Sequence, residues 1–248
     1  MSTIYIMWLR QMIRYFRSPP RMIGALAQPL LYMVALGFGF SAVFRQAGQG
    51  DYMAFLAPGI IGMTILFSGM FGGMELIWDR QFGFLKETLA APVSRFNVMM
   101  GRTAGGATVA TLQGLLVLVM ATLFGFRPEH WFAIVPTIAM MFLVALLFTT
   151  LGTWVATALA DFQGFQLIMN FMVMPMFFLS GALYPLENVP TALTVVARLN
   201  PLAYGVDGLR GLVGGASHFG LALDVGVVAG LTLIALALGS RAFSRIEA

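Results

Sequence analysis

Long apolar runs separated by short polar connections constrain this chain more than any other feature. A helix needs about 20 mostly apolar residues to cross a hydrocarbon core of roughly 30 Å. Six stretches are long enough: 22–44, 53–75, 98–125, 131–160, 164–184 and 219–240. Only 10% of the 248 residues are charged, whereas soluble domains carry about 25%. The sequence therefore predicts an all-α integral membrane protein with six transmembrane helices, in a single domain covering residues 1–248.

The positions of Lys and Arg predict the orientation, because basic connections stay on the cytoplasmic side. With the N-terminus inside, ten of the 14 bases lie inside, and four lie outside: Arg45, Arg127, Arg198 and Arg210. We therefore expect both termini to be cytoplasmic. The net charge of +4 is explained by this asymmetry. We expect no nucleic-acid partner, because the bases are sparse and sit between apolar runs.

Residues 1–21 predict an amphipathic interface helix on the inner leaflet. Basic side chains recur at helical spacing and apolar ones occupy another face: Arg10, Arg14, Arg17 and Arg21 against Ile4, Trp8, Met12 and Tyr15. Pro19 and Pro20 then break this helix before the first span. The alternative is that these arginines simply flank the first span.

The longest polar insertion on the inner side runs from Glu75 to Arg102. Its central part, 79–95, mixes apolar and charged residues and predicts a short helix with an apolar stripe. Such a helix either seats in a groove of a partner or rests on the lipid surface. The candidate contact residues are Asp79, Arg80, Phe82, Gly83, Phe84, Leu85, Glu87, Thr88 and Leu89.

A second unusual stretch, 185–211, is too polar to span a bilayer and too apolar for an ordinary loop. It contains three prolines together with polar and charged residues: Pro185, Glu187, Pro190, Asn200, Pro201 and Arg210.

The fifth run, 164–184, carries Met169, Met172 and Met176 at helical spacing. Flexible, polarizable thioethers suit a path for varied apolar ligands, although core or lipid-facing packing explains them too. Gln166 and Asn170 lie four residues apart on the same run, and polar groups are costly in hydrocarbon. We therefore expect those two to face an interior surface.

Three glycine pairs have G-x-x-x-G spacing, which permits close helix approach inside the chain or between two copies. They are Gly69/Gly73, Gly101/Gly105 and Gly226/Gly230.

The residues for catalysis are missing from the sequence. There is no phosphate-binding G-x-x-x-x-G-K-[ST] loop and no cysteine, and His130 and His218 each stand alone. We expect no catalytic residues, no metal site and no cofactor in this chain. A membrane enzyme, or a channel without an ATPase partner, remains the alternative from another class.

Two motifs carry a resemblance to a known family. E-x-x-W-D-R-Q-F-G-F-L-K-E-T-L-A-A-P-V-S-R covers Glu75 to Arg95, and S-G-A-L-Y-P-L-E-N-V-P with L-N-P-L-A-Y-G-V-D-G-L-R follows from Ser180. Both resemble the ABC transporter type-2 permease family, in particular half-size permeases of drug-efflux and nodulation-type exporters.

The resemblance implies a transport subunit of the bacterial inner membrane. The 79–95 stretch would be its coupling helix, seated in a separate ABC ATP-binding subunit that is present in two copies and holds ATP and Mg. Two copies of this chain would form a homodimer among membrane lipid. The 185–211 segment would form outer re-entrant helices that cap the path.

The implied function is export of an amphipathic drug-like or lipid-like solute by alternating access. An excess of Phe and Met, 22 and 18, over Tyr and Trp, 6 and 4, leans toward hydrophobic solutes. Export of polysaccharide or lipid-linked glycan is the alternative substrate class.

Overall fold

A computed structural model describes residues 2–46, 51–128, 131–159, 161–214 and 217–245, and every regular element in these ranges is helical. His130 and the side chain of Leu89 lie outside the described residues. The elements are α1 (Thr3–Phe16), α2 (Pro19–Tyr32), η1 (Met33–Phe38), α3 (Gly39–Gln46), α4 (Tyr52–Gly72), α5 (Met74–Gln81), α6 (Phe84–Ala90), α7 (Arg95–Leu123), η2 (Trp131–Ala133), α8 (Ile134–Ala158), α9 (Phe162–Phe178), η3 (Leu186–Asn188), α10 (Thr191–Leu199), α11 (Pro201–Gly214) and α12 (Leu221–Ser244).

Five helical stretches in the described ranges are long and apolar enough to cross a membrane. They are Met22–Gln46, Tyr52–Gln81, Arg95–Leu123, Ile134–Ala158 and Leu221–Ser244. The remaining predicted run, 164–184, forms α9, which has 17 residues and falls short of the roughly 20 that a straight span needs. The all-helical membrane class is thus confirmed, while the count of six spans stays a prediction.

The single helix predicted over 79–95 is wrong in its boundaries. The second span continues through α5 to Gln81, and a separate short helix, α6, begins at Phe84. Gly83 between them has a φ of 80°, a left-handed conformation that glycine adopts without a side-chain clash. The chain therefore turns sharply here and presents α6 at the end of the bundle.

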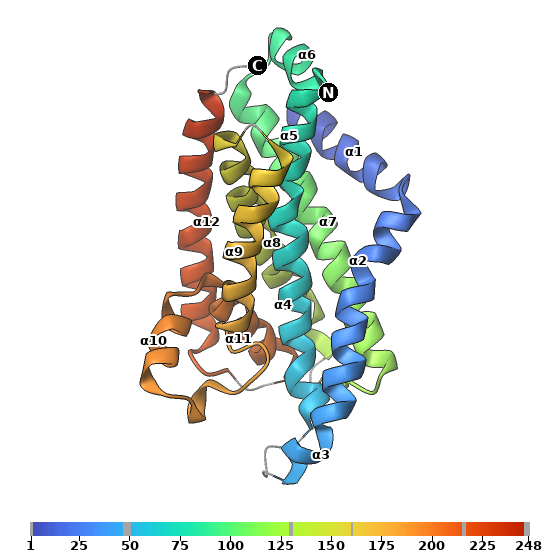
Figure 1. Cartoon of the computed structure of the whole chain (residues 1–248), viewed down its shortest axis with the longest axis vertical. Helices are drawn as coiled ribbons and strands as arrows, with labels where there is room; N and C mark the ends of the chain where they lie inside the picture. The colour runs from blue at the N-terminus through green and yellow to red at the C-terminus, as the bar shows by residue number, and fades with distance from the viewer. Residues whose placement is uncertain (1, 47–50, 129–130, 160, 215–216, 246–248) are drawn as a thin grey trace.

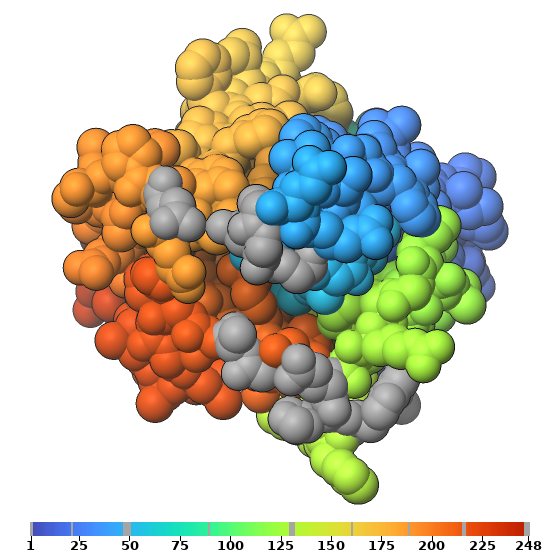
Figure 2. Space-filling view, turned by 90° about the horizontal axis from the view of Figure 1, so that it is seen from below, coloured from blue at the N-terminus to red at the C-terminus, as the bar shows by residue number. Residues whose placement is uncertain are grey.

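The long helices run side by side along the molecule (Figure 1). One end of the molecule, the α6 end, holds α5, α6, the start of α1 and of α7, and the last turn of α12. Arg95 donates a hydrogen bond of 2.7 Å to the Ser244 carbonyl there. At the opposite end, the α3 end, lie α3, α10 and α11. Figure 2, seen from the α3 end, shows α2–α3, α7, α12 and the α9–α10 region arranged around its periphery.

The interface helix predicted over 1–21 forms as α1, but one of its faces packs on protein. The indole Nε1 of Trp8 donates to Thr108 Oγ1 on α7 at 3.0 Å. A Cβ at Gly105 would come within 2.7 Å of the Gln11 side chain, so this glycine allows the close approach. The glycine pair on α7 thus serves packing inside the chain.

The other two glycine pairs differ from each other. Gly73 lies against the backbone of Gly152 on α8, and Gly69 is close to the backbone of Thr149, so this pair also serves internal packing. Gly226 and Gly230 on α12 have open space where a Cβ would stand. Their face is not used for packing among the described residues.

Candidate functional site

A cluster of charged side chains surrounds Asp79 on α5. The carboxylate, only 4% exposed, accepts hydrogen bonds from Arg10 on α1 at 2.7 and 2.9 Å. It also pairs with Arg102 on α7, which is itself 4% exposed. Arg14, one turn further along α1, lies 3.7 Å from both Asp79 and Glu75. We call these five residues the Asp79 cluster.

The ion pairs of the cluster connect α5 to α1 and α7. Bidentate guanidinium–carboxylate pairing fixes orientation as well as distance. Separating α1, α5 and α7 would leave buried charges without partners, which is strongly destabilising. The Asp79 cluster therefore holds α5 against α1 and α7.

Two further contacts tie α5 to α8 and α9. Arg80 donates hydrogen bonds to the carbonyls of Leu159 and Thr157, at 3.0 and 3.4 Å, at the end of α8. Trp78 stacks on Phe162 at the start of α9, with ring centroids 6.0 Å apart and planes inclined by 2°. Side chains of α5 therefore contact four neighbouring helices, α1, α7, α8 and α9, and a displacement of α5 would change these contacts.

The turn after α5 and the α6 helix carry apolar and charged side chains. Phe82 is 83% exposed. The guanidinium carbon of Arg10 lies 3.8 Å from the ring centroid of Phe84, which is half-buried. Glu87 is exposed, and the Thr88 hydroxyl donates to the Phe84 carbonyl. Leu85 is 1% exposed and belongs to the core of this chain, so the expectation that it contacts a partner is corrected.

The 185–211 segment is anchored at the α3 end by polar contacts to main-chain carbonyls. Asn200 caps α11 by accepting from the Leu202 amide at 3.0 Å, and Pro201 takes the first helical position. The Asn200 amide donates to the Met176 carbonyl at 2.6 Å. Arg210 donates to the Gly181 carbonyl at 3.2 Å, with its guanidinium carbon 4.0 Å from the centroid of the Phe55 ring.

The two helices of this segment differ in burial. Helix α11 packs against α4, α8 and α12, and most of its described side chains are buried. Helix α10 is mainly exposed, and among its described residues Ala197 is buried. Glu187 and Pro190 are exposed, and Pro185 is half-buried. The depth of the segment in the membrane stays a prediction.

The residues proposed as a substrate path on α9 do not share one face. Met169 is fully buried and Met172 and Met176 are half-buried, and all three contribute to the chain's own core. Gln166 and Asn170 are exposed on another side of the helix. Gln166 and Asn170 therefore do not face the interior of a single protomer, and an interior surface formed with a second copy stays a prediction for them. The three methionines pack as core residues.

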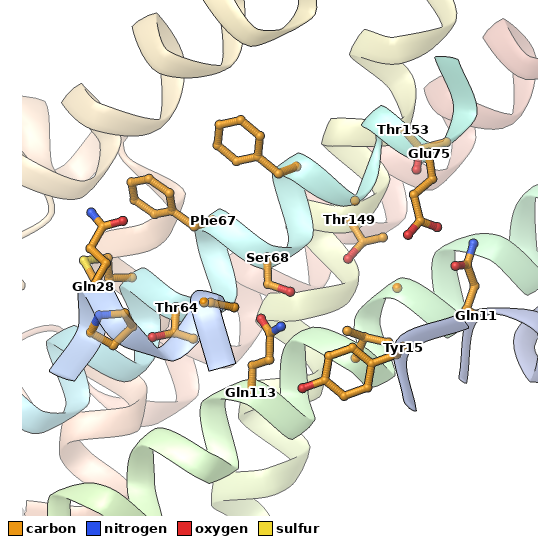
Figure 3. A pocket seen from close by; sticks show the side chains of 18 of the residues that line it. Gln11, Tyr15, Gln28, Thr64, Phe67, Ser68, Glu75, Gln113, Thr149 and Thr153 are labelled. Atoms are coloured by element: carbon orange, nitrogen blue, oxygen red, sulfur yellow. The ribbon is translucent and has the colours of Figure 1, made fainter. Parts of the chain in front are cut away.

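A polar cavity that the sequence analysis missed lies between α1, α2, α4, α5, α7 and α8 (Figure 3). Its volume is about 260 Å³. Among its lining residues are Gln11, Tyr15, Gln28, Thr64, Phe67, Ser68, Phe71, Glu75, Arg102, Gln113, Thr149 and Thr153. Lone Gln, Ser and Thr residues inside otherwise apolar runs were the available signal. They come from five separate helices, so no single run showed that they converge.

The Asp79 cluster lies directly against this cavity, because Glu75 and Arg102 belong to both. The described residues contain no group of three or more His, Cys, Asp or Glu that could hold a metal ion. A multi-pass helical protein with a partly open cavity that contains polar lining residues, beside a segment joined to its neighbours by ion pairs, has an arrangement compatible with a transport permease.

Comparison with known proteins places the chain within that class. The sequence profile of the ABC-2 type transporter family matches residues 2–213, and the chain belongs to this family. It is 26% identical over 224 residues to Nodulation protein J of Rhizobium leguminosarum bv. viciae, covering 89% of this chain and 86% of that protein. It is 27% identical over 210 residues to "Putative transport permease ycf38" of Cyanophora paradoxa, covering 84% and 72%.

Proposed function

We propose that this chain is the permease subunit of an ATP-driven exporter whose ATP hydrolysis resides in a separate polypeptide. The observation that carries the proposal is the connection of α5 to α1, α7, α8 and α9 through the Asp79 cluster, Arg80 and Trp78. An ATP-binding subunit that moves the adjoining α6 would thereby shift several helices together.

The docking surface for that subunit centres on the exposed part of the turn and of α6. Phe82 is the large apolar side chain most exposed there, and the neighbouring Glu87 is exposed as well. An aromatic anchor surrounded by polar residues is a common arrangement at protein interfaces. Two copies of the ATP-binding subunit, with ATP and Mg, would serve two permease chains.

A homodimer is supported by the exposed face of α9. Gln166 and Asn170 are exposed there, and polar groups facing lipid are costly. Phe171, the residue after Asn170, is 77% exposed. A second copy across this face would cover these residues, and alternating access would occur between the two protomers.

The proposed cargo is an amphipathic solute carried from the cytoplasm or the inner leaflet. The polar side chains that line the cavity favour an amphiphile with a glycan or other hydroxyl-bearing headgroup over a purely apolar drug. A drug-like solute is the second candidate, supported by the many exposed Phe side chains.

The proposal is tested by reconstituting the chain in lipid with and without its ATP-binding subunit. We expect no ATP hydrolysis by the chain alone, and hydrolysis by the complex that requires an intact Walker A lysine in the partner. Hydrolysis that persists in the chain after every partner has been removed would refute the division of labour.

A further inference from the structure

The polar cavity contains more hydrogen-bonding capacity than packing requires. The Thr149 hydroxyl is buried without a hydrogen-bond partner, and the residue is only 2% exposed. Figure 3 shows Ser68, Gln113 and Thr149 directed into one common space between the helices. Unsatisfied polar groups at membrane depth are costly, which makes them candidates for binding a ligand.

We propose that this cavity binds the uncharged, hydroxyl-rich headgroup of an amphiphile within a single protomer. Hydroxyl and amide side chains both donate and accept hydrogen bonds, as a polyhydroxylated ring requires. Phe67 and Phe71 add aromatic surface to the lining. The inference rests on the proposed transport function, because it places cargo recognition next to the coupling segment.

The charges at the cavity favour a neutral headgroup. Glu75 and Arg102 are the ionisable lining residues of opposite sign, and each is paired outside the cavity. Arg102 pairs with Asp79, and Glu75 lies 3.7 Å from Arg14. The lining itself therefore carries one charge of each sign, each already in an ion pair, so a phosphate or ammonium headgroup would have to compete with an existing pair.

The size and position of the cavity indicate that it takes a headgroup and leaves the tail in lipid. Its 260 Å³ is below the roughly 300–1,000 Å³ of sites that enclose drug-sized ligands. It extends from Gln28, exposed on α2, to the almost fully buried Gln113 and Thr149. Ile23 and Leu31, on the same helix as Gln28, are 71% and 64% exposed and would contact acyl chains.

The shared residues give this site a direct route to the coupling segment. A headgroup bound beside Glu75 and Arg102 would touch two members of the Asp79 cluster. Occupancy of the cavity would consequently bias the position of α5.

The test uses the full chain alone in phosphatidylcholine nanodiscs and an alkyl maltoside carrying a diazirine next to the sugar. We expect photolabelling within residues 24–29 and 63–72, competed by excess alkyl maltoside and not by an alkyl phosphocholine. Thr149→Val combined with Gln113→Leu should reduce labelling about fivefold or more, because two neutral hydrogen bonds are lost.

A matched control is available one residue along α8. The Thr150 hydroxyl is already bonded to the Leu146 carbonyl at 2.6 Å and does not line the cavity, so Thr150→Val should label like wild type. Ser68→Leu places an apolar side chain in the cavity and should also reduce labelling. Agreement between this variant and the double variant would show that the loss does not come from misfolding of the double variant alone.

Labelling elsewhere, equal labelling by a choline-headed probe, or undiminished labelling of both cavity variants would overturn the inference. Because no ATP-binding subunit is present, this result is independent of the proposed division of labour. A chain that binds the maltoside probe but forms no transporting complex would refute the proposed function and leave the binding site standing.

Discussion

Replacing Asp79 with Asn tests the Asp79 cluster, since it removes one charge and almost no volume. Arg10 and Arg14 are 26% and 33% exposed and can turn toward water. Arg102 is 4% exposed and cannot, so it is left as a buried charge without its partner. Breaking a buried ion pair in this way typically costs about 3–5 kcal/mol.

The expected loss is large enough to measure as a melting temperature. At about 2–4 °C per kcal/mol for a chain of this size, Asp79→Asn should melt on the order of 10 °C below wild type. Intrinsic fluorescence of the purified chain in detergent, checked by size-exclusion profiles after heating, provides the assay. Glu87→Gln, at an exposed position on α6, should melt within about 2 °C of wild type.

A double variant separates the ion pair from other effects of the substitution. Asp79→Leu with Arg102→Met replaces both buried partners by apolar side chains, which is often close to neutral. It should therefore recover most of the lost stability. A single variant as stable as wild type, or a double variant less stable than the single one, would show that Arg102 does not depend on Asp79.

Three further predictions concern topology, packing and coupling. In this naturally cysteine-free chain, Thr191→Cys should react with an impermeant thiol reagent in intact spheroplasts and Glu87→Cys only after lysis; the opposite pattern would invert the orientation. Gly73→Ala should lower the melting temperature, since overpacking costs about 1–3 kcal/mol and its Cβ would meet the Gly152 backbone, while Gly72→Ala has open space and should not. Arg80→Lys loses the forked contact to two carbonyls and should uncouple transport from ATP hydrolysis in the reconstituted complex; transport at the wild-type rate would contradict that role.

Hydropathy predicted the class of this fold because few backbone structures satisfy their hydrogen bonds inside a bilayer. Each buried main-chain group needs a partner within its own segment, so long apolar runs form helices wherever they occur. The length predicted for the run at 164–184 was too great, because α9 ends at Phe178. Pro175 and the left-handed Gly181, at a φ of 75°, lie near that end, and hydropathy does not detect them.

The parts of the candidate site whose residues are close together in the sequence were predicted, and the parts formed by residues on distant helices were missed. The 79–95 stretch was identified from its mixed polarity, but the partners of Asp79 lie on α1 and α7. Leu85 has the same character as Phe84 in sequence, and only packing shows that it turns into the core. The cavity is lined by residues from six helices, and their convergence depends on tertiary structure.

Photocrosslinking at Phe82 tests most directly whether the α5–α6 turn contacts a separate ATP-binding subunit. A benzoylphenylalanine at Phe82, which is 83% exposed, should crosslink in cells to a polypeptide that mass spectrometry identifies as an ABC ATP-binding subunit. The same probe at Phe132, which is 100% exposed in η2, a short helix that contacts α11, should not. A complex that assembles and transports while Phe82 crosslinks only to lipid, or while Phe132 captures the ATP-binding subunit, would contradict the account.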